Sequence, residues 1–315
     1  MRILIAIDGS PHGEVVVQAA ARILRRAEAP ALQLCTVIDA SEVHATQVRF
    51  PGAEIPRGVG WAGPGLAPQG PSARTAEDRA RALARMRDEG EQRLSHLAAM
   101  HLAAHEVETR VEIAEGATRA IVNAAERFGA DLLFLGTHGR SGLRRMVLGS
   151  VAQAVVHHSD VPAVLVRELP PAPAGVDTPP QMLLPTDGSR RVRAALPRAG
   201  VLAGALGATV TLIQVMERSS LVVQSTISAQ RRAIERELEE GIAQLAAAGV
   251  RAEGAVLEGD PPRAVVGAAR ERAAELMLVP THDRSEAGRI VFGSVADRLI
   301  HDAPCPVALL KARQA

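Results

Sequence analysis

The chain has 315 residues, of which 47% are hydrophobic and 23% are charged, a composition typical of soluble globular proteins with room for two cores. Its 36 Lys and Arg residues balance 35 Asp and Glu residues, so the net charge of +1 excludes a broad electrostatic attraction to nucleic acid or to an anionic membrane. No uncharged stretch approaches the roughly 20 residues that span a bilayer. We therefore expect a cytoplasmic protein with no nucleic-acid or membrane partner.

Short β-type segments alternate with helical segments along the first half of the chain. The N-terminal segment is an apolar strand that ends at Asp8, and Ser10 followed by Pro11 is typical of a helix N-cap and first turn. Alternation of this kind requires parallel strands joined by right-handed crossovers, which predicts a doubly wound α/β domain. The expected strands lie near 2–8, 31–38, 106–113, 131–136 and 162–167, and the expected helices near 11–27, 75–103, 117–128 and 150–159.

The long helix expected at 75–103 carries apolar and small residues at a spacing of three and four. This spacing puts them on one helix face, which we expect to pack against a sheet. The residues of this face are Leu83, Met86, Gly90, Leu94 and Leu97.

The same sequence pattern occurs twice in the same order, which indicates that one fold is used twice. Residues 8–10 recur as 187–189, and the segment from Thr137 to Ala152 recurs from Thr281 to Ala296. A proline-rich, semi-extended segment separates the two copies, as is typical of a domain boundary. We predict domains at 1–168 and 181–315, joined by a linker at 169–180.

Two cysteines, Cys35 and Cys305, each lie in an apolar run. This setting favours buried, reduced thiols over a disulfide or a metal site.

A glycine-rich loop between a strand and a helix is the strongest functional signal in the sequence. It runs from Gly136 through Gly139 to Gly149, and a helix is expected to start at Ser150. Glycines let backbone N–H groups approach a phosphate closely, and a helix N-terminus adds unpaired donors and the positive end of the helix dipole. Ser150 offers a further donor, and Arg140 is one of three arginines that can supply positive charge. Taken alone, such a loop is equally consistent with a simple turn.

The spacing Gly136-x2-Gly139-x9-Gly149-Ser150 resembles the nucleotide-binding signature of ATP-binding universal stress proteins. The similarity extends to Asp8, to Val37-Ile38-Asp39 and to the final strand of each half, so it covers both halves of the chain. It implies two Rossmann-like, five-stranded parallel sheets with helices on both faces, arranged as an intrachain pseudo-dimer through their last strands. The function that it implies is a stress-response or regulatory module that binds ATP, with or without Mg²⁺.

The resemblance also assigns roles to residues of the first half, at the carboxyl ends of the strands where doubly wound folds bind ligands. It places Val37 at the base, and Asp8 and Gly136 at the nucleoside. Asp8 has the alternative role of capping the helix that begins after Ser10. The residues that it assigns to the phosphates are Gly139, Gly149, Ser150 and Val151, and we add Arg140 to the nucleotide-binding residues as a source of positive charge.

The second half departs from this signature, because Pro280 stands at the position of Gly136 and Asp283 at that of Gly139. Proline removes a backbone donor and a carboxylate repels phosphate, so we expect no ordinary triphosphate binding there. The second half is then either a structural domain or a vestigial site for a smaller or less charged ligand. The residues of such a vestigial site are Asp187, Val215, Gly293 and Ser294.

The first half also carries an insertion at 40–74, which contains Trp61, the only tryptophan. It is either a disordered surface loop or a lid over the cleft at the strand ends.

The sequence contains no P-loop, nucleophile elbow or zinc-protease motif, so we assign no catalytic residue and no metal site. Three functions stay open at this point: an ATP-binding regulatory module, a slow ATPase, and an interaction scaffold without a ligand. The sequence names no client protein, and further association into a homodimer also stays open.

Overall fold

The computed structural model describes residues 1–41, 76–137, 148–172, 175, 177–217, 224–281 and 293–311. The insertion that we expected at 40–74 lies outside the described residues from position 42 onward. Gly139, Arg140 and Asp283 also lie outside them.

The first half forms five parallel strands with four helices, as the sequence predicts. In strand order β3-β2-β1-β4-β5, each strand is parallel to its neighbours. The first helix ends at Leu24, earlier than the expected position near 27. The elements are β1 (Arg2–Ile7), α1 (Pro11–Leu24), β2 (Ala31–Asp39), α2 (Ala76–His101), β3 (Val107–Ala114), α3 (Ala117–Phe128), β4 (Leu132–Gly136), α4 (Ser150–His158) and β5 (Ala163–Val166).

The second half repeats this arrangement in the reverse direction along the sheet. Read from its outer edge inward, its order β8-β7-β6-β9-β10 corresponds strand by strand to β3-β2-β1-β4-β5. Its strands are parallel to one another as well. The elements are β6 (Gln181–Thr186), α5 (Arg190–Ala205), β7 (Thr209–Met216), α6 (Gln224–Ala247), β8 (Ala252–Glu258), α7 (Pro261–Glu271), β9 (Leu276–Thr281), α8 (Ser294–Asp302) and β10 (Val307–Lys311).

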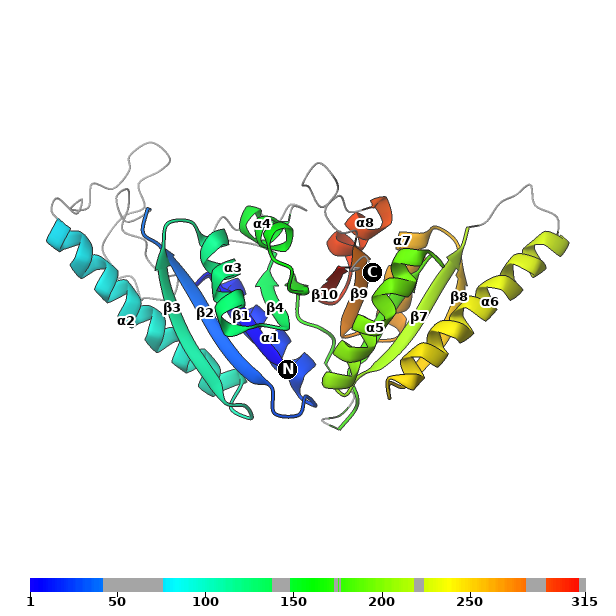
Figure 1. The fold of residues 1–315 in the computed structure, drawn as a ribbon, viewed down its shortest axis with the longest axis horizontal. Coiled ribbons are helices and arrows are strands. Elements are labelled where there is room, and N and C mark those ends of the chain that lie inside the picture. Colours follow the sequence, from blue (N-terminus) through cyan, green and yellow to red (C-terminus); the bar gives the residue numbers. More distant parts are fainter. Residues whose placement is uncertain are drawn as a thin grey trace, which may run out of the picture.

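The two halves are joined through their last strands, as predicted. β5 and β10 pair antiparallel, with Val307 opposite Leu165 and Leu309 opposite Ala163. This single antiparallel pair fuses the two parallel sheets into one mixed sheet of ten strands, and the halves extend from it as two wings (Figure 1). The pairing covers one edge of each half, which removes two templates for aggregation.

Apolar side chains pack on both faces of the sheet. One layer is formed by α1, α2, α5 and α6, and the other by α3, α4, α7 and α8. On α2 the predicted face is buried at Gly90, Leu94 and Leu97 and half-buried at Leu83 and Met86. Gly90 permits close approach to the sheet, because a Cβ atom there would lie 3.1 Å from Cγ2 of Val111.

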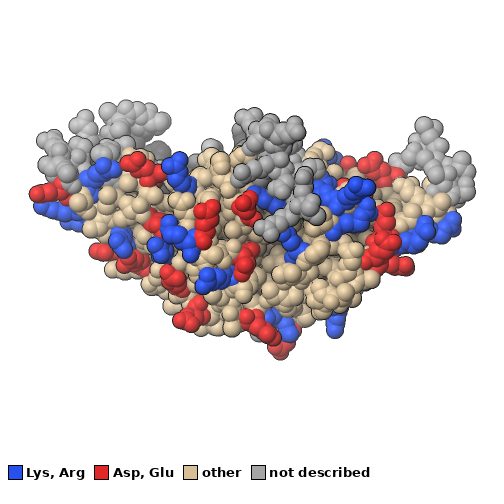
Figure 2. All heavy atoms as spheres, viewed as in Figure 1, with Lys and Arg blue, Asp and Glu red and all other residues tan. Residues whose placement is uncertain are grey.

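The surface is mixed in charge, with acidic and basic side chains interspersed over the face shown in Figure 2. Both cysteines are buried and free, as predicted. Within the described part of the chain, no helix combines the length and the apolar character that crossing a bilayer requires.

Candidate functional site

The carboxyl ends of three neighbouring strands carry the residues predicted to contact a nucleoside. Asp8 follows β1, Gly136 ends β4, and Val37 lies in β2, with β1 between the other two strands. Val37 is buried. The sheet order therefore brings these residues to one edge, where doubly wound folds place their ligand sites.

Asp8 makes a local hydrogen bond in the turn that follows β1. Its Oδ1 accepts from the amide of Ser10 at 3.0 Å, and Gly9 has the positive φ of 74° that this tight turn needs. The second half repeats the arrangement, since Oδ1 of Asp187 accepts from the amide of Ser189 at 3.0 Å. The Asp8–Ser10 bond shapes the turn before α1, whose N-cap Ser10 makes no side-chain cap hydrogen bond, so Asp8 does not cap the helix itself.

Gly136 lies directly against His12, a residue that the sequence analysis did not select. Nε2 of His12 donates to the carbonyl oxygen of Val166 at 2.9 Å, which ties α1 to β5. A Cβ atom on Gly136 would lie 2.9 Å from Cδ2 of His12, so only glycine fits without a shift of the ring. The signal was present in the sequence, because His12 follows the Asp-Gly-Ser turn that both halves share.

The helix start predicted to bind phosphates is present at α4. Gly149 precedes the helix, and Ser150 and Val151 are its first two residues and are exposed. The first N–H groups of a helix have no partner within it, so they face whatever lies beyond the end. The amide of Gly149 itself donates to the carbonyl oxygen of Thr137 at 2.9 Å. Gly149 therefore holds the end of the loop beside β4. The N–H donors that can face a phosphate are those of the first residues of α4.

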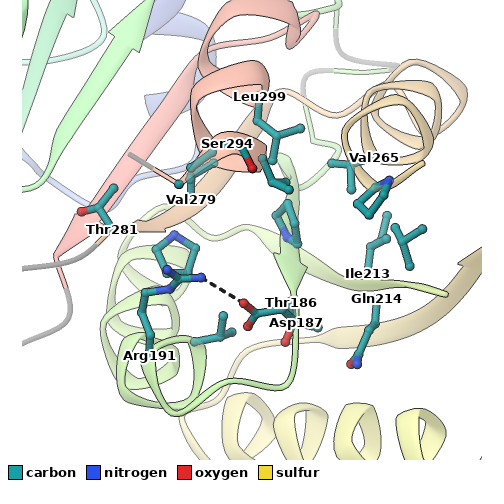
Figure 3. Close-up of a pocket in the computed structure, with 18 of the residues that line it drawn as sticks. Thr186, Asp187, Arg191, Ile213, Gln214, Val265, Val279, Thr281, Ser294 and Leu299 are labelled. Carbon is teal, nitrogen blue, oxygen red and sulfur yellow. Dashed lines mark hydrogen bonds and ion pairs between the residues drawn. The ribbon is translucent and has the colours of Figure 1, made fainter. Parts of the chain in front are cut away.

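The second half contains a cavity of about 370 Å³ at the corresponding place (Figure 3). It lies at the ends of β6, β7 and β9 and reaches the first residues of α8. All four residues that the sequence assigned to a vestigial site line this cavity, namely Asp187, Val215, Gly293 and Ser294. The sequence analysis missed other parts of its wall, among them Arg191, Pro185 and Val265.

Arg191 occupies the place that His12 has in the first half, two residues after the serine of the shared turn. Its Nη2 donates to Oδ2 of Asp187 at 3.0 Å, the contact drawn as a dashed line in Figure 3. Partial burial alone would raise the pKa of Asp187, but hydrogen bonds from the hydroxyl and amide of Ser189 and the charge of Arg191 outweigh it. The pKa of Asp187 is therefore below its ordinary value, and Asp187 and Arg191 form an ion pair at neutral pH.

The strand order and the sites at the strand ends define a protein of two tandem, doubly wound α/β domains. The chain belongs to the universal stress protein family, whose family model matches residues 65–167 and 180–311. It is 29% identical over 133 residues to a universal stress protein of Thermus aquaticus, an alignment that covers 41% of this chain and 97% of that protein. It is 40% identical over 63 residues to a universal stress protein of Methanocaldococcus jannaschii, but these residues are 20% of this chain and span only 37% of the relative.

Solved structures show the same fold across the whole chain. A universal stress protein from Archaeoglobus fulgidus superposes with a TM-score of 0.63 at 17% identity, over 99% of this chain and 98% of the other. A protein described as a putative universal stress protein from Pseudomonas aeruginosa gives a TM-score of 0.55 at 14% identity, over 98% and 92% of the two chains. At these identities the likeness concerns the fold alone.

Proposed function

We propose that this universal stress protein is an ATP-binding stress-response or regulatory module that acts in the cytoplasm and binds its nucleotide in the first half. The observation that carries this proposal is the start of α4. Its exposed N-terminal residues Ser150 and Val151 follow a glycine-rich loop that leaves the sheet at Gly136. Unpaired N–H donors and the positive end of the helix dipole are suited to phosphate.

The proposed roles divide between the sheet edge and the loop. Val37 would contact the base, and Asp8 and Gly136 the ribose, because they lie at neighbouring strand ends. Ser150 and Val151 would donate to the phosphates, and Gly149 would fix the end of the loop through its bond to Thr137. For Gly139 and Arg140 the support is the sequence signature.

The second half is less suited to a triphosphate. Pro280 replaces Gly136 and has no N–H to donate, and Asp283 replaces Gly139. Arg191, the arginine among the described residues of this cavity wall, is paired with Asp187. We therefore propose one ATP site per chain.

Calorimetric titration of the full chain with ATP and Mg²⁺ tests this proposal. We expect one site in the wild type and none in Gly139→Asp, which introduces the residue that the second half carries. ATP at about 100 times its dissociation constant should stabilise the wild type by roughly 2.7 kcal/mol. Gly267→Asp is the matched control, because Gly267 lies in α7 with open space where a Cβ atom would extend. Two equivalent sites, or wild-type affinity in a folded Gly139→Asp protein, would show that the assignment is wrong.

Product analysis in the same samples separates binding from hydrolysis. Stoichiometric binding without release of ADP supports a regulatory module, whereas steady release of ADP identifies a slow ATPase.

A further inference from the structure

The cavity of the second half adjoins a shortened strand pairing in the sheet. In the first half, β1 and β4 pair from Ile3 opposite Leu132 to Ala6 opposite Leu135. The corresponding strands β6 and β9 pair only at Met182 with Leu276 and at Leu183 with Met277. The β6–β9 ladder ends after these two pairs, and the cavity lies at this end of the two strands.

Two prolines lie near the end of this shortened ladder. Pro185 stands at the position of Ala6 and Pro280 at that of Gly136, and both line the cavity. Proline cannot donate to a ladder and is rare in central strands, yet β6 and β9 are both central. Each proline stays in register with its other neighbour, Pro185 with β7 and Pro280 with β10. The shortened ladder therefore lies at one side of the cavity, whose wall also takes residues from β7, α7 and α8.

The wall of this cavity is largely apolar. Val265 and Val279 are 2% and 3% exposed, and Leu299 and the two prolines add further apolar surface. The hydroxyls of Thr186 and Ser294 belong to the same wall and offer a few polar contacts. A volume of about 370 Å³ falls in the range of small-molecule sites, which combine mainly apolar walls with a few polar groups. Flat proline and valine surfaces are suited to a ring.

The charges on the wall do not favour an anion. Among the lining residues that the structure describes, the ionised side chains are Asp187, Glu217 and Arg191, which together leave one negative charge. The N-terminus of α8 offsets this by only about half a positive charge. Arg191 is held by Asp187 at 3.0 Å, so its charge is already compensated. A phosphate group would therefore meet a net negative charge from the described part of this wall.

We propose that this cavity binds an uncharged, flat ring compound of nucleoside size and discriminates against the phosphorylated form of such a compound. The two prolines line the space, the valines and Leu299 hold the ring, and the Asp187–Arg191 pair withholds the positive charge that a phosphate needs. This inference concerns the second half alone, and it stands whether or not the first half binds ATP.

The test uses adenosine and AMP as probes, because they differ only in the phosphate. Methyl groups of Ile213, Val265 and Val279, labelled with carbon-13 in the full chain, report on the second half, and those of Ile121 and Leu135 report on the first. We expect adenosine to shift the second-half methyl signals with a dissociation constant about tenfold or more below that of AMP. Equal affinity for both probes, or shifts confined to the first half, would contradict the proposal.

Two kinds of variant test whether adenosine binds in this cavity. Val265→Phe fills the cavity and should abolish the adenosine shifts at Ile213 and Val279, whereas Ile121→Phe, the aligned change in the first half, should leave them unchanged. If Val265→Phe does not fold, the double variant Pro185→Ala and Pro280→Gly restores the residues of the first half. It should extend the β6–β9 ladder and weaken adenosine binding about tenfold or more. Undiminished binding in the folded variants would place the ligand elsewhere.

A charge variant tests the discrimination separately. Asp187→Asn removes the carboxylate that pairs with Arg191, so AMP should bind about fivefold more tightly while adenosine changes little. An unchanged ratio of the two affinities would show that the ion pair does not set the preference.

Discussion

Arg25 and Glu275 join the two halves of the chain, 250 positions apart in sequence, through two hydrogen bonds. The guanidinium donates to both carboxylate oxygens, at 2.5 and 2.8 Å, and the two side chains are only 10% and 3% exposed. The same guanidinium donates to the carbonyl oxygen of Thr178 at 2.9 Å, and Glu275 also accepts from the amide of Gln181 at 3.3 Å. The pair thus connects the end of α1, the linker and the start of β9.

Removing one partner of this buried pair should destabilise the protein strongly. Arg25→Ala leaves Glu275 as an uncompensated buried charge, which typically costs about 3–5 kcal/mol of unfolding free energy. The double variant Arg25→Met and Glu275→Leu should recover most of this loss, because both charges are then gone. Denaturant unfolding measures both effects.

Arg231→Ala provides the matched control, since Arg231 and Glu235 form an exposed pair with side chains 50% and 46% accessible. Such pairs contribute less than about 1 kcal/mol. Similar losses for Arg25→Ala and Arg231→Ala would contradict a structural role of the buried pair.

The contact between Gly136 and His12 gives a second prediction. Gly136→Ala places a Cβ atom 2.9 Å from the ring of His12 and should cost about 1–2 kcal/mol of stability through overpacking. In a His12→Ala background the same change should cost less than half as much, because the ring is absent. Thermal or denaturant unfolding of the four proteins forms a double-mutant cycle. Strict additivity would indicate that the ring moves aside freely and that glycine is not required here.

The order of the elements in the first half and most of their approximate bounds were predictable from the sequence, because apolar runs alternate with helical spacing and are separated by Gly and Pro. The pairing of the halves followed from the resemblance to the family and from the repeat. The cavity of the second half was not predictable in this way. Its shape depends on Pro185 and Pro280 lying on neighbouring strands. That Arg191 stands where the first half has His12 could be connected with a site only after the structure placed both side chains beside the strand ends. Arg25 and Glu275 meet only because the halves are placed against each other.

Lys311 is the only lysine of the chain and lies at the junction of the halves. It is 6% exposed, and its Nζ donates to the carbonyl oxygen of Ser159 in the first half. An amine-acylating reagent at pH 8 should therefore modify the α-amino group of the native protein and spare Lys311. Mass spectrometry of peptides should show modification of Lys311 only after denaturation. Rapid acylation in the native state would mean that this junction opens readily.

The two thiols provide a prediction on pH, because the chain has no tyrosine and one lysine, so few other groups titrate in the alkaline range. Burial raises the pKa of Cys35 from 9.0 to about 12, and the neighbouring charge of Glu112 acts in the same direction. Burial also raises the pKa of Cys305 to about 12. Because the thiolate is the reactive species, both cysteines should resist a disulfide reagent at pH 8 in the native protein and react fully in denaturant.

The same shifts predict how stability depends on pH. Both pKa values are higher in the folded than in the unfolded chain, so the stabilisation is complete below pH 9 and is lost as the pH rises from 9 towards 12. A Cys35→Ala and Cys305→Ala double variant should show a smaller loss of unfolding free energy over this range than the wild type. Each single variant should lie between the two, since each thiol is buried in its own half. Denaturant unfolding at several pH values measures these slopes, and identical slopes in all four proteins would show that the thiols do not determine the alkaline limit.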